Sequence, residues 1–206
     1  MNIKTINEKL NEGRSYRNVM EALAADNKIV EGYATTFNEP YELFSYDGYT
    51  VVEQVDPSAF DECDMSDVIM QYNHEGRVFA RISNGTLNLK QDDKGLKIRA
   101  DLSGTELGLQ VYEEIRGGYT DKMSFGFKVA EDKREITENR EDGTVTVLRT
   151  ITKISKLYDV SAVSIPANDA TSISARNFGK GVIDEILEES KKRERQKQKI
   201  KLILEV

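Results

Sequence analysis

The sequence has no tryptophan, one cysteine, one histidine and only three prolines in 206 residues. The single cysteine, Cys63, excludes an internal disulfide framework and suits a reducing compartment. The single histidine, His74, excludes a Ser-His-His triad within one chain and a zinc site built from histidines. No apolar run approaches the roughly 18 residues that a membrane-spanning helix needs. Any serine or cysteine chemistry that depends on an imidazole must therefore use His74.

The charge of the chain is unevenly distributed. The formal net charge is −7, but residues 191–206 carry seven Lys or Arg and two Glu, a local +5, so residues 1–190 sum to −12. An acidic body argues against non-specific nucleic-acid binding. The length allows one domain or one domain plus tails. With 38% hydrophobic and 32% charged residues, the composition is that of a globular protein, and we expect part of the chain to be highly solvated.

Hydrophobic periodicity predicts a mainly β domain of the α+β class over residues 27–177. Strands are expected where apolar residues alternate or cluster, near residues 28–37, 49–55, 67–74, 77–83, 86–90, 96–102, 122–130, 144–154 and 157–166. We expect residues 1–26 to form a polar leader with a helical piece over 16–25, and residues 178–206 to form a charged helical tail. An isolated amphipathic helix such as this tail is marginal unless it docks on something.

One internal helix is expected near the middle of the chain. Ser103 and Glu106 have the spacing of a capping box, and apolar residues recur every four positions from Leu107 to Ile115. The pair Gly117–Gly118 follows, and glycine is common just past the end of a helix. We therefore expect a helix that starts after Ser103 and ends at these glycines.

The segment KMSFGF holds the first candidate for chemistry. In an extended strand, Met123, Phe125 and Phe127 share one face, which suits a core, whereas Ser124 and Gly126 share the other. A small hydroxyl beside a residue without a side chain lets another backbone approach closely, as a peptide substrate would require. The alternative is that Ser124 is simply a small residue on a partly exposed strand face.

His74 lies at the end of the apolar run VIMQYNH, directly before Glu75 and Gly76. Imidazole titrates close to neutral pH, so it is the natural base for a hydroxyl, and a serine nucleophile needs such a base within hydrogen-bond reach. The alternative is a structural histidine at a strand end.

A third group would orient the imidazole and stabilise its charged form. Candidate acids are Asp159, Asp169, Asp121 and Glu75. Asp159 is favoured because the run LYDVSAVSIP is otherwise nearly apolar, and a buried carboxylate needs a partner. Strand alternation also permits Asp159 to face solvent, which is the alternative.

Cys63 with His74 is the rival pair of nucleophile and base. Five acidic residues lie within residues 56–67 around this cysteine, and nearby negative charge raises the pKa of a thiol. A reactive thiolate is thereby disfavoured, so Cys63 is set aside.

Six motifs follow one another along the chain. They are EGYATTFNEP (31–40), DPSAF (56–60), QYNHEGRVFARI (71–82), DDKGLKIRADL (92–102), GLQVYEEIRGGYTDKMSFGF (108–127) and LYDVSAVSIPANDATSISAR (157–176). This ordered set resembles the prohead (procapsid) maturation protease family of tailed bacteriophages, over about residues 27–176. Each motif alone is weak, whereas the set in this order is specific.

The resemblance implies a serine endopeptidase whose fold is similar to that of the herpesvirus assembly proteases, a β-barrel with accessory helices. The histidine of the family's Asn-His motif is His74, the implied general base, and the serine of its Ser-Phe-Gly-Phe motif is Ser124, the implied nucleophile. The acid before the Val-Ser of the late strand is Asp159, the implied third member. The herpesvirus enzymes use a second histidine there, which this chain lacks. No metal or organic cofactor is implied.

By the same resemblance, the substrates are the scaffold protein or scaffold domain and the N-terminal region of the major capsid protein, cut inside the assembled procapsid in the host-cell cytoplasm. Such enzymes also cleave themselves, and no nucleic-acid or membrane partner is expected. The +5 tail is either a scaffold-docking element or an idle, solvated segment, and self-association stays open. The alternative functions are a non-catalytic β-barrel structural protein of the virion, and a host peptidase or inactive prophage remnant of the same fold.

Overall fold

Strands dominate the structure. The computed structural model describes residues 15–24, 26–163 and 173–204. Its strands are β1 (Ser15–Ala24), β2 (Ile29–Thr36), β3 (Tyr41–Tyr46), β4 (Tyr49–Val55), β5 (Ile69–Tyr72), β6 (Glu75–Arg81), β7 (Leu87–Gln91), β8 (Gly95–Asp101), β9 (Lys122–Glu138) and β10 (Val145–Val163). The helices are α2 (Glu106–Arg116) and α3 (Ile173–Leu204), with short 3-10 turns η1 (Asp26–Lys28) and η2 (Pro57–Phe60). The predicted mainly β class is confirmed.

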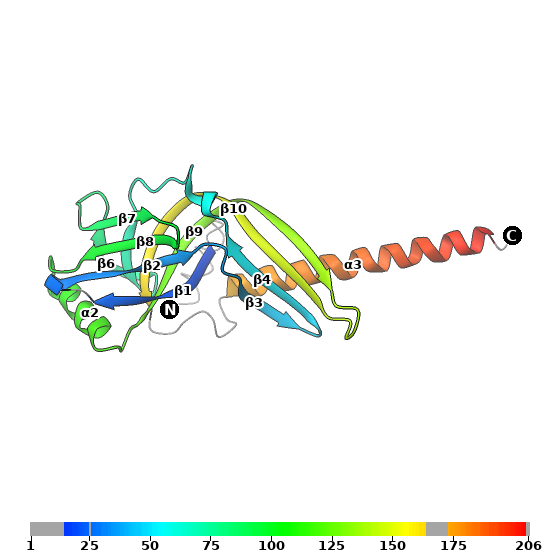
Figure 1. Cartoon of the computed structure of the whole chain (residues 1–206), viewed down its shortest axis with the longest axis horizontal. Coiled ribbons are helices and arrows are strands. Elements are labelled where there is room, and N and C mark those ends of the chain that lie inside the picture. The colour runs from blue at the N-terminus through cyan, green and yellow to red at the C-terminus, as the bar shows by residue number, and fades with distance from the viewer. Residues whose placement is uncertain (1–14, 25, 164–172, 205–206) are drawn as a thin grey trace.

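One ten-stranded sheet holds these strands together. Its hydrogen-bonded path runs β3-β4-β10-β9-β1-β2-β8-β7, while β5 pairs with β10 and β6 pairs with β5. Across the described residues this path is open from β3 to β7, so the closed barrel implied by the resemblance is not confirmed. In Figure 1, α2 lies at the end of the molecule opposite the projecting end of α3, and β9 and β10 curve through the middle.

The N-terminal strand corrects a prediction. We expected a helical piece over residues 16–25, but residues 15–24 form β1, which pairs antiparallel with both β9 and β2. A segment of this length is too short to be stable as an isolated helix, so pairing along two strand edges outweighs local helix propensity. Residues 15–24 of the predicted leader are therefore part of the sheet.

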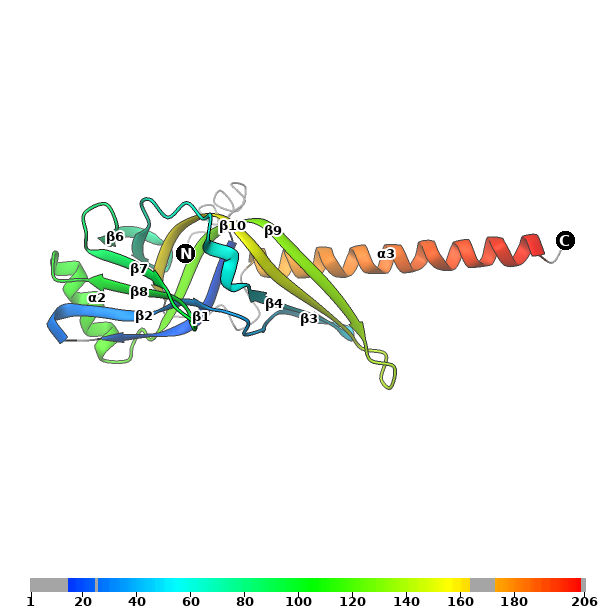
Figure 2. The same cartoon turned by 45° about the horizontal axis from the view of Figure 1, so that its top comes forward.

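Two long antiparallel strands connect the body of the sheet to an arm. β9 has 17 residues and β10 has 19, where we expected separate strands at 144–154 and 157–166. Register shifts between residues 151 and 159 of β10 bend the strand without ending it. β10 pairs in parallel with β4 through its first half and with β5 near its end. The outer halves of β9 and β10 form the arm together with β3 and β4 (Figure 1, Figure 2).

The main hydrophobic core combines alternate residues of the strands with one face of α2. Phe125 and Phe127 of β9 are fully buried, as the period-two pattern predicted. Their rings stack with the centroids 4.3 Å apart. Burying an aromatic side chain of this size contributes about 1.5–3 kcal/mol relative to exposure. The same core includes Val30, Leu96, Ile98, Val111, Ile115, Met123, Ile151 and Val160.

The helix α2 has a different N-terminal cap from the predicted one. Thr105 Oγ1 accepts a hydrogen bond from the Gly108 N–H at 2.9 Å, whereas the Ser103 N–H donates to the preceding aspartate. Thr105 immediately precedes the first helical residue, so it is the N-cap, and Ser103 belongs to the turn before it. The C-terminal end is as predicted, because Gly118 has a φ of +73°, which glycine adopts without strain.

The helix α3 docks on the arm and then continues beyond it. Val182 and Ile183 are buried in a second, smaller core with side chains of β3, β4 and β10. Every described side chain after residue 187 is exposed, and Figure 1 shows this part of α3 projecting as a single rod. In the part of the chain that the structure describes, no helix is both long and apolar enough to cross a membrane.

A buried ion-pair network holds the arm together. Arg149 of β10 donates from Nη1 to Glu53 of β4 at 2.7 Å and from Nη2 to Asp132 of β9 at 2.6 Å. The Tyr41 hydroxyl of β3 also donates to Glu53, at 2.6 Å. The Glu53 side chain is fully buried, so these donors stabilise its charge in place of water.

Arg149→Ala is expected to lower the free energy of unfolding by about 3–5 kcal/mol, because it removes the cationic partner of a buried carboxylate. Urea unfolding would measure this loss. Arg134→Ala is the matched control, because Arg134 is partly exposed and pairs with Asp132 and Glu185. That control should cost at most about 1 kcal/mol. Equal losses in the two variants would contradict the role given to the buried network.

Candidate active site

His74 occupies the tight turn between β5 and β6. Asn73 and His74 are the two turn residues, with φ of 51° and 60°, and Tyr72 pairs with Glu75 across the turn. Two-residue hairpins favour this left-handed backbone, which asparagine and histidine adopt more readily than most residues. The Asn73 N–H donates to the Ala162 carbonyl of β10 at 2.9 Å. The turn therefore holds His74 beside the end of β10.

Ser124 lies on β9, on the face opposite the aromatic core residues. Met123 and Phe125, its neighbours on either side, are fully buried in the core. Ser124 itself is 2% exposed, and its register partners are Ser161 on β10 and Asn18 on β1. Strand alternation thus directs the Ser124 hydroxyl to the other side of the sheet from the aromatic rings, as the sequence pattern predicted.

Asp159 lies on β10, at the same end of the sheet. It pairs in register with Ile69 of β5 and with Gly126 of β9. Asp159 is 2% exposed, so the solvent-facing alternative does not hold. The carboxylate therefore lies between the strand that leads to His74 and the strand that carries Ser124.

The three side chains form one hydrogen-bonded line. Ser124 Oγ is 2.6 Å from His74 Nε2, and Asp159 Oδ1 is 2.5 Å from His74 Nδ1. An ionised carboxylate can only accept, so Nδ1 carries a proton and Nε2 of the neutral ring accepts from the Ser124 hydroxyl. We assign this tautomer from the hydrogen-bond partners. The line can move a proton from the hydroxyl to the imidazole while the carboxylate holds the ring.

A fourth polar side chain, Ser161, belongs to this cluster, and the sequence analysis missed it. Ser161 Oγ donates to Asp159 Oδ1 at 2.9 Å, and that oxygen also contacts His74. Ser161 is fully buried. The signal that could have revealed it is its spacing, because residues two apart in a strand share a face and Ser161 follows Asp159 by two.

The other acids considered for the third position are Asp121, Glu75 and Asp169. Asp121 is exposed and pairs with Lys122 at 3.5 Å, in the segment that leads into β9. Glu75 is the first residue of β6. Asp169 lies outside the described residues. Among the described candidates, the structure brings Asp159 into hydrogen-bond contact with His74.

Cys63 is half-buried, and its environment disfavours a thiolate. Burial is the largest cause that raises the pKa of Cys63 to about 11, and the negative charge of Asp64 adds to it. Such a thiol carries very little thiolate near neutral pH. The outcome agrees with the sequence argument, but desolvation contributes more than the neighbouring acids do.

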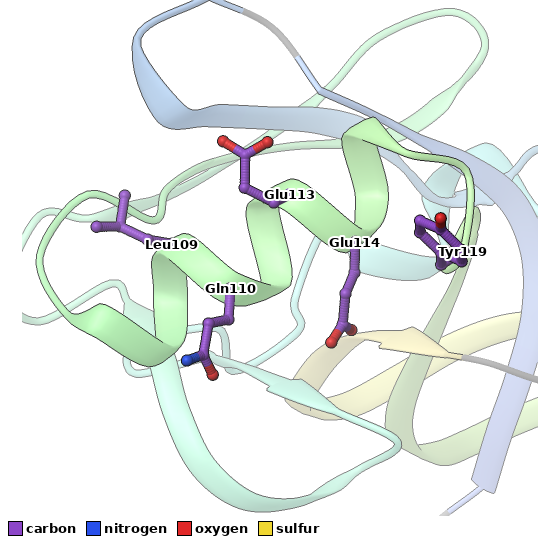
Figure 3. A pocket seen from close by; sticks show the side chains of 5 residues that line it. All are labelled: Leu109, Gln110, Glu113, Glu114 and Tyr119. Carbon is purple, nitrogen blue, oxygen red and sulfur yellow. The ribbon is translucent and has the colours of Figure 1, made fainter.

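A surface pocket lies along α2, as Figure 3 shows, and it is lined by Leu109, Gln110, Glu113, Glu114 and Tyr119. Tyr119 is largely exposed, and Glu113 forms ion pairs with Lys28 and Arg116. None of the side chains that line this pocket belongs to the hydrogen-bonded line of Ser124. Over the described ranges, no group of three or more His, Cys, Asp or Glu side chains could hold a metal ion.

A hydroxyl, an imidazole and a carboxylate joined in this order are typical of serine hydrolases. Comparison with known protein families identifies one family within this class of enzymes. Residues 16–184 match the family described as caudovirus prohead serine protease. The chain belongs to this family of bacteriophage capsid-maturation proteases, as the ordered motifs indicated. No curated protein and no solved structure matches the chain.

Proposed function

We propose that this chain is a serine endopeptidase in which Ser124 is the nucleophile, His74 is the general base and Asp159 orients His74. The observation that carries the proposal is the line of hydrogen bonds from the Ser124 hydroxyl through both nitrogens of His74 to the Asp159 carboxylate. Membership in a serine peptidase family supports the same chemistry.

The reaction that this arrangement supports is acyl transfer to Ser124. Ser124 Oγ bonds to the carbonyl carbon of the scissile peptide while its proton moves to His74 Nε2, and the carbon–nitrogen bond breaks as that proton passes to the leaving amine. Water then attacks the acyl ester, gives a proton to His74 Nε2, and the proton returns to Ser124 Oγ as the product acid leaves. Asp159 stays ionised throughout and stabilises the imidazolium.

Access to the nucleophile is restricted in this conformation. Ser124 is 2% exposed and His74 is 6% exposed, so an extended peptide reaches the Ser124 hydroxyl only after a local rearrangement. A binding partner that prefers the rearranged form, in which Ser124 is accessible, increases the population of that form. A closed site therefore suits an enzyme whose cleavage is confined to one assembly state.

We propose that the substrates are the scaffold protein or scaffold domain, the N-terminal region of the major capsid protein, and the chain itself. Family membership supports this choice, and it also supports cleavage inside the procapsid in the host-cell cytoplasm. We also propose that the fold is similar to that of the herpesvirus assembly proteases. Superposition of an experimental structure on those enzymes would test it.

The direct test is co-expression with the capsid protein that is encoded beside this chain, compared with a Ser124→Ala chain and read by intact mass. A shortened capsid protein and a trimmed protease are expected with the wild type, and the new termini would give the cleavage rule. Full-length masses in every sample would favour a non-catalytic virion subunit or an inactive remnant.

We propose that residues 178–206 serve docking rather than catalysis, and that stability needs this tail only as far as residue 187. A chain that ends there should keep its melting temperature within about 2 °C, because the described side chains beyond it are exposed. Ile183→Ala is the control, and it should cost about 2–5 kcal/mol because Ile183 is buried on the arm. Calorimetry measures both, and early melting of the shortened chain would contradict the proposal.

A further inference from the structure

Two side chains converge on the same oxygen of Asp159. His74 Nδ1 lies 2.5 Å from Asp159 Oδ1, and Ser161 Oγ donates to that oxygen at 2.9 Å. All three residues are buried, so water does not compete freely for these contacts. The geometry of His74 therefore depends on a carboxylate that is itself held by a second donor.

The position of Ser161 is fixed by strand pairing on both sides. It pairs with Ser124 on β9 and with Gln71 on β5, so its backbone is held between two neighbouring strands. A fully buried hydroxyl needs a hydrogen-bond partner, and Asp159 supplies one two residues earlier on the same strand face. The hydroxyl thus reaches Asp159 from a rigid part of the sheet.

We propose that Ser161 is a positioning residue for the reaction, a step that rests on the proposed function of Ser124, His74 and Asp159. Ser161 holds the Asp159 carboxylate so that Oδ1 stays aligned with His74 Nδ1. The last torsion of an aspartate side chain is broad, so the orientation of the carboxylate depends on its hydrogen-bond partners. A second donor on the same oxygen limits rotation about that torsion and also stabilises the ionised form.

Ser161→Ala is expected to slow the reaction of Ser124 by about 10- to 100-fold, the change that follows the loss of one hydrogen bond to a charged group. The first measurement uses the full-length chain and a fluorophosphonate probe, which needs no knowledge of the natural substrate. Ser124 Oγ bonds to phosphorus, fluoride leaves, and His74 takes the hydroxyl proton. The rate constant of labelling therefore reports how well the nucleophile is activated.

Three further variants serve as controls for the labelling measurement. Ser155→Ala is the matched control, because Ser155 is an exposed serine of β10 whose hydroxyl donates to the Lys128 carbonyl. It should label at the wild-type rate. Ser161→Thr keeps the hydroxyl and should recover most of the rate, whereas Ser124→Ala should not label. Melting temperatures of all variants separate a loss of activation from a loss of folding.

The second measurement is the proton resonance of His74 Nδ1–H. Because the chain has one histidine, this signal is assigned without ambiguity. Ser161→Ala should shift the resonance, and Ser155→Ala should leave it unchanged. A purely structural role for Ser161 would not move it.

The outcomes distinguish this proposal from the proposed function. Labelling within twofold of wild type together with an unchanged His74 resonance in Ser161→Ala would overturn the positioning role. If the wild-type chain neither labels nor cleaves capsid protein, the proposed function fails. The resonance comparison then still decides whether Ser161 orients His74 through Asp159.

Discussion

Capsid protein co-expressed with the Ser124→Ala chain should stay at full length, whereas the wild-type chain should shorten it. The substitution removes the hydroxyl that forms the acyl ester, and loss of the nucleophile from an intact triad lowers the rate by about 10⁶-fold. Ser124 lies opposite the core face of β9, so the packing of Met123 and Phe125 is unaffected. Intact mass of the capsid protein and of the protease measures the result.

The control for this experiment is Ser155→Ala, which deletes a serine hydroxyl from β10 away from the cluster and should leave cleavage as in the wild type. Matching melting temperatures would show that the Ser124→Ala chain is folded. Shortened capsid protein in the Ser124→Ala sample would mean that another residue is the nucleophile.

Asp159→Asn should lower the rate of cleavage by about 10⁴-fold while the chain stays folded. The amide has nearly the same shape as the carboxylate, but its NH₂ group can donate to His74 Nδ1. The ring proton then moves to Nε2, which can no longer accept from the Ser124 hydroxyl. Initial rates of capsid cleavage, with the fluorophosphonate labelling rate as a second measure, would report the loss.

Asp121→Asn is the matched control for Asp159→Asn. Asp121 is an exposed acid that immediately precedes β9, and it was one of the alternatives for the third position. Its amide variant should cleave at the wild-type rate. A large loss in Asp121→Asn with little change in Asp159→Asn would reverse the assignment of the orienting acid.

Local pattern predicted the elements whose structure depends on neighbours in the sequence. Alternation along β9 predicted that Met123 and Phe125 face the core and that Ser124 lies on the opposite face. The glycines after α2 predicted where that helix ends. The strand β1 was missed because residues 15–24 become a strand only through pairing with β9 and β2, which are distant in the sequence. The unbroken length of β10 was missed for the same reason, since its bulges interrupt the periodicity while the ladder continues.

The candidate site was predicted in part. The single histidine limited the choice of base to His74, and the strand pattern favoured Ser124. Asp159 was one of four acids, because sequence alone does not show that β5 pairs with β10 and brings His74 next to it. Ser161 was overlooked because a serine in an apolar strand carries no charge that demands a partner.

The members of the hydrogen-bonded line are far apart along the chain. His74 is 85 residues from Asp159 and 50 residues from Ser124. Contacts across such separations form only after long loops have closed, which is slow and entropically costly. β5 pairs with β10, the last strand of the sheet in chain order, so a growing chain on the ribosome holds serine and histidine before it holds their aspartate. On the proposed function, the unfinished polypeptide lacks the acid that orients His74, and we expect protease activity only once synthesis has passed β10.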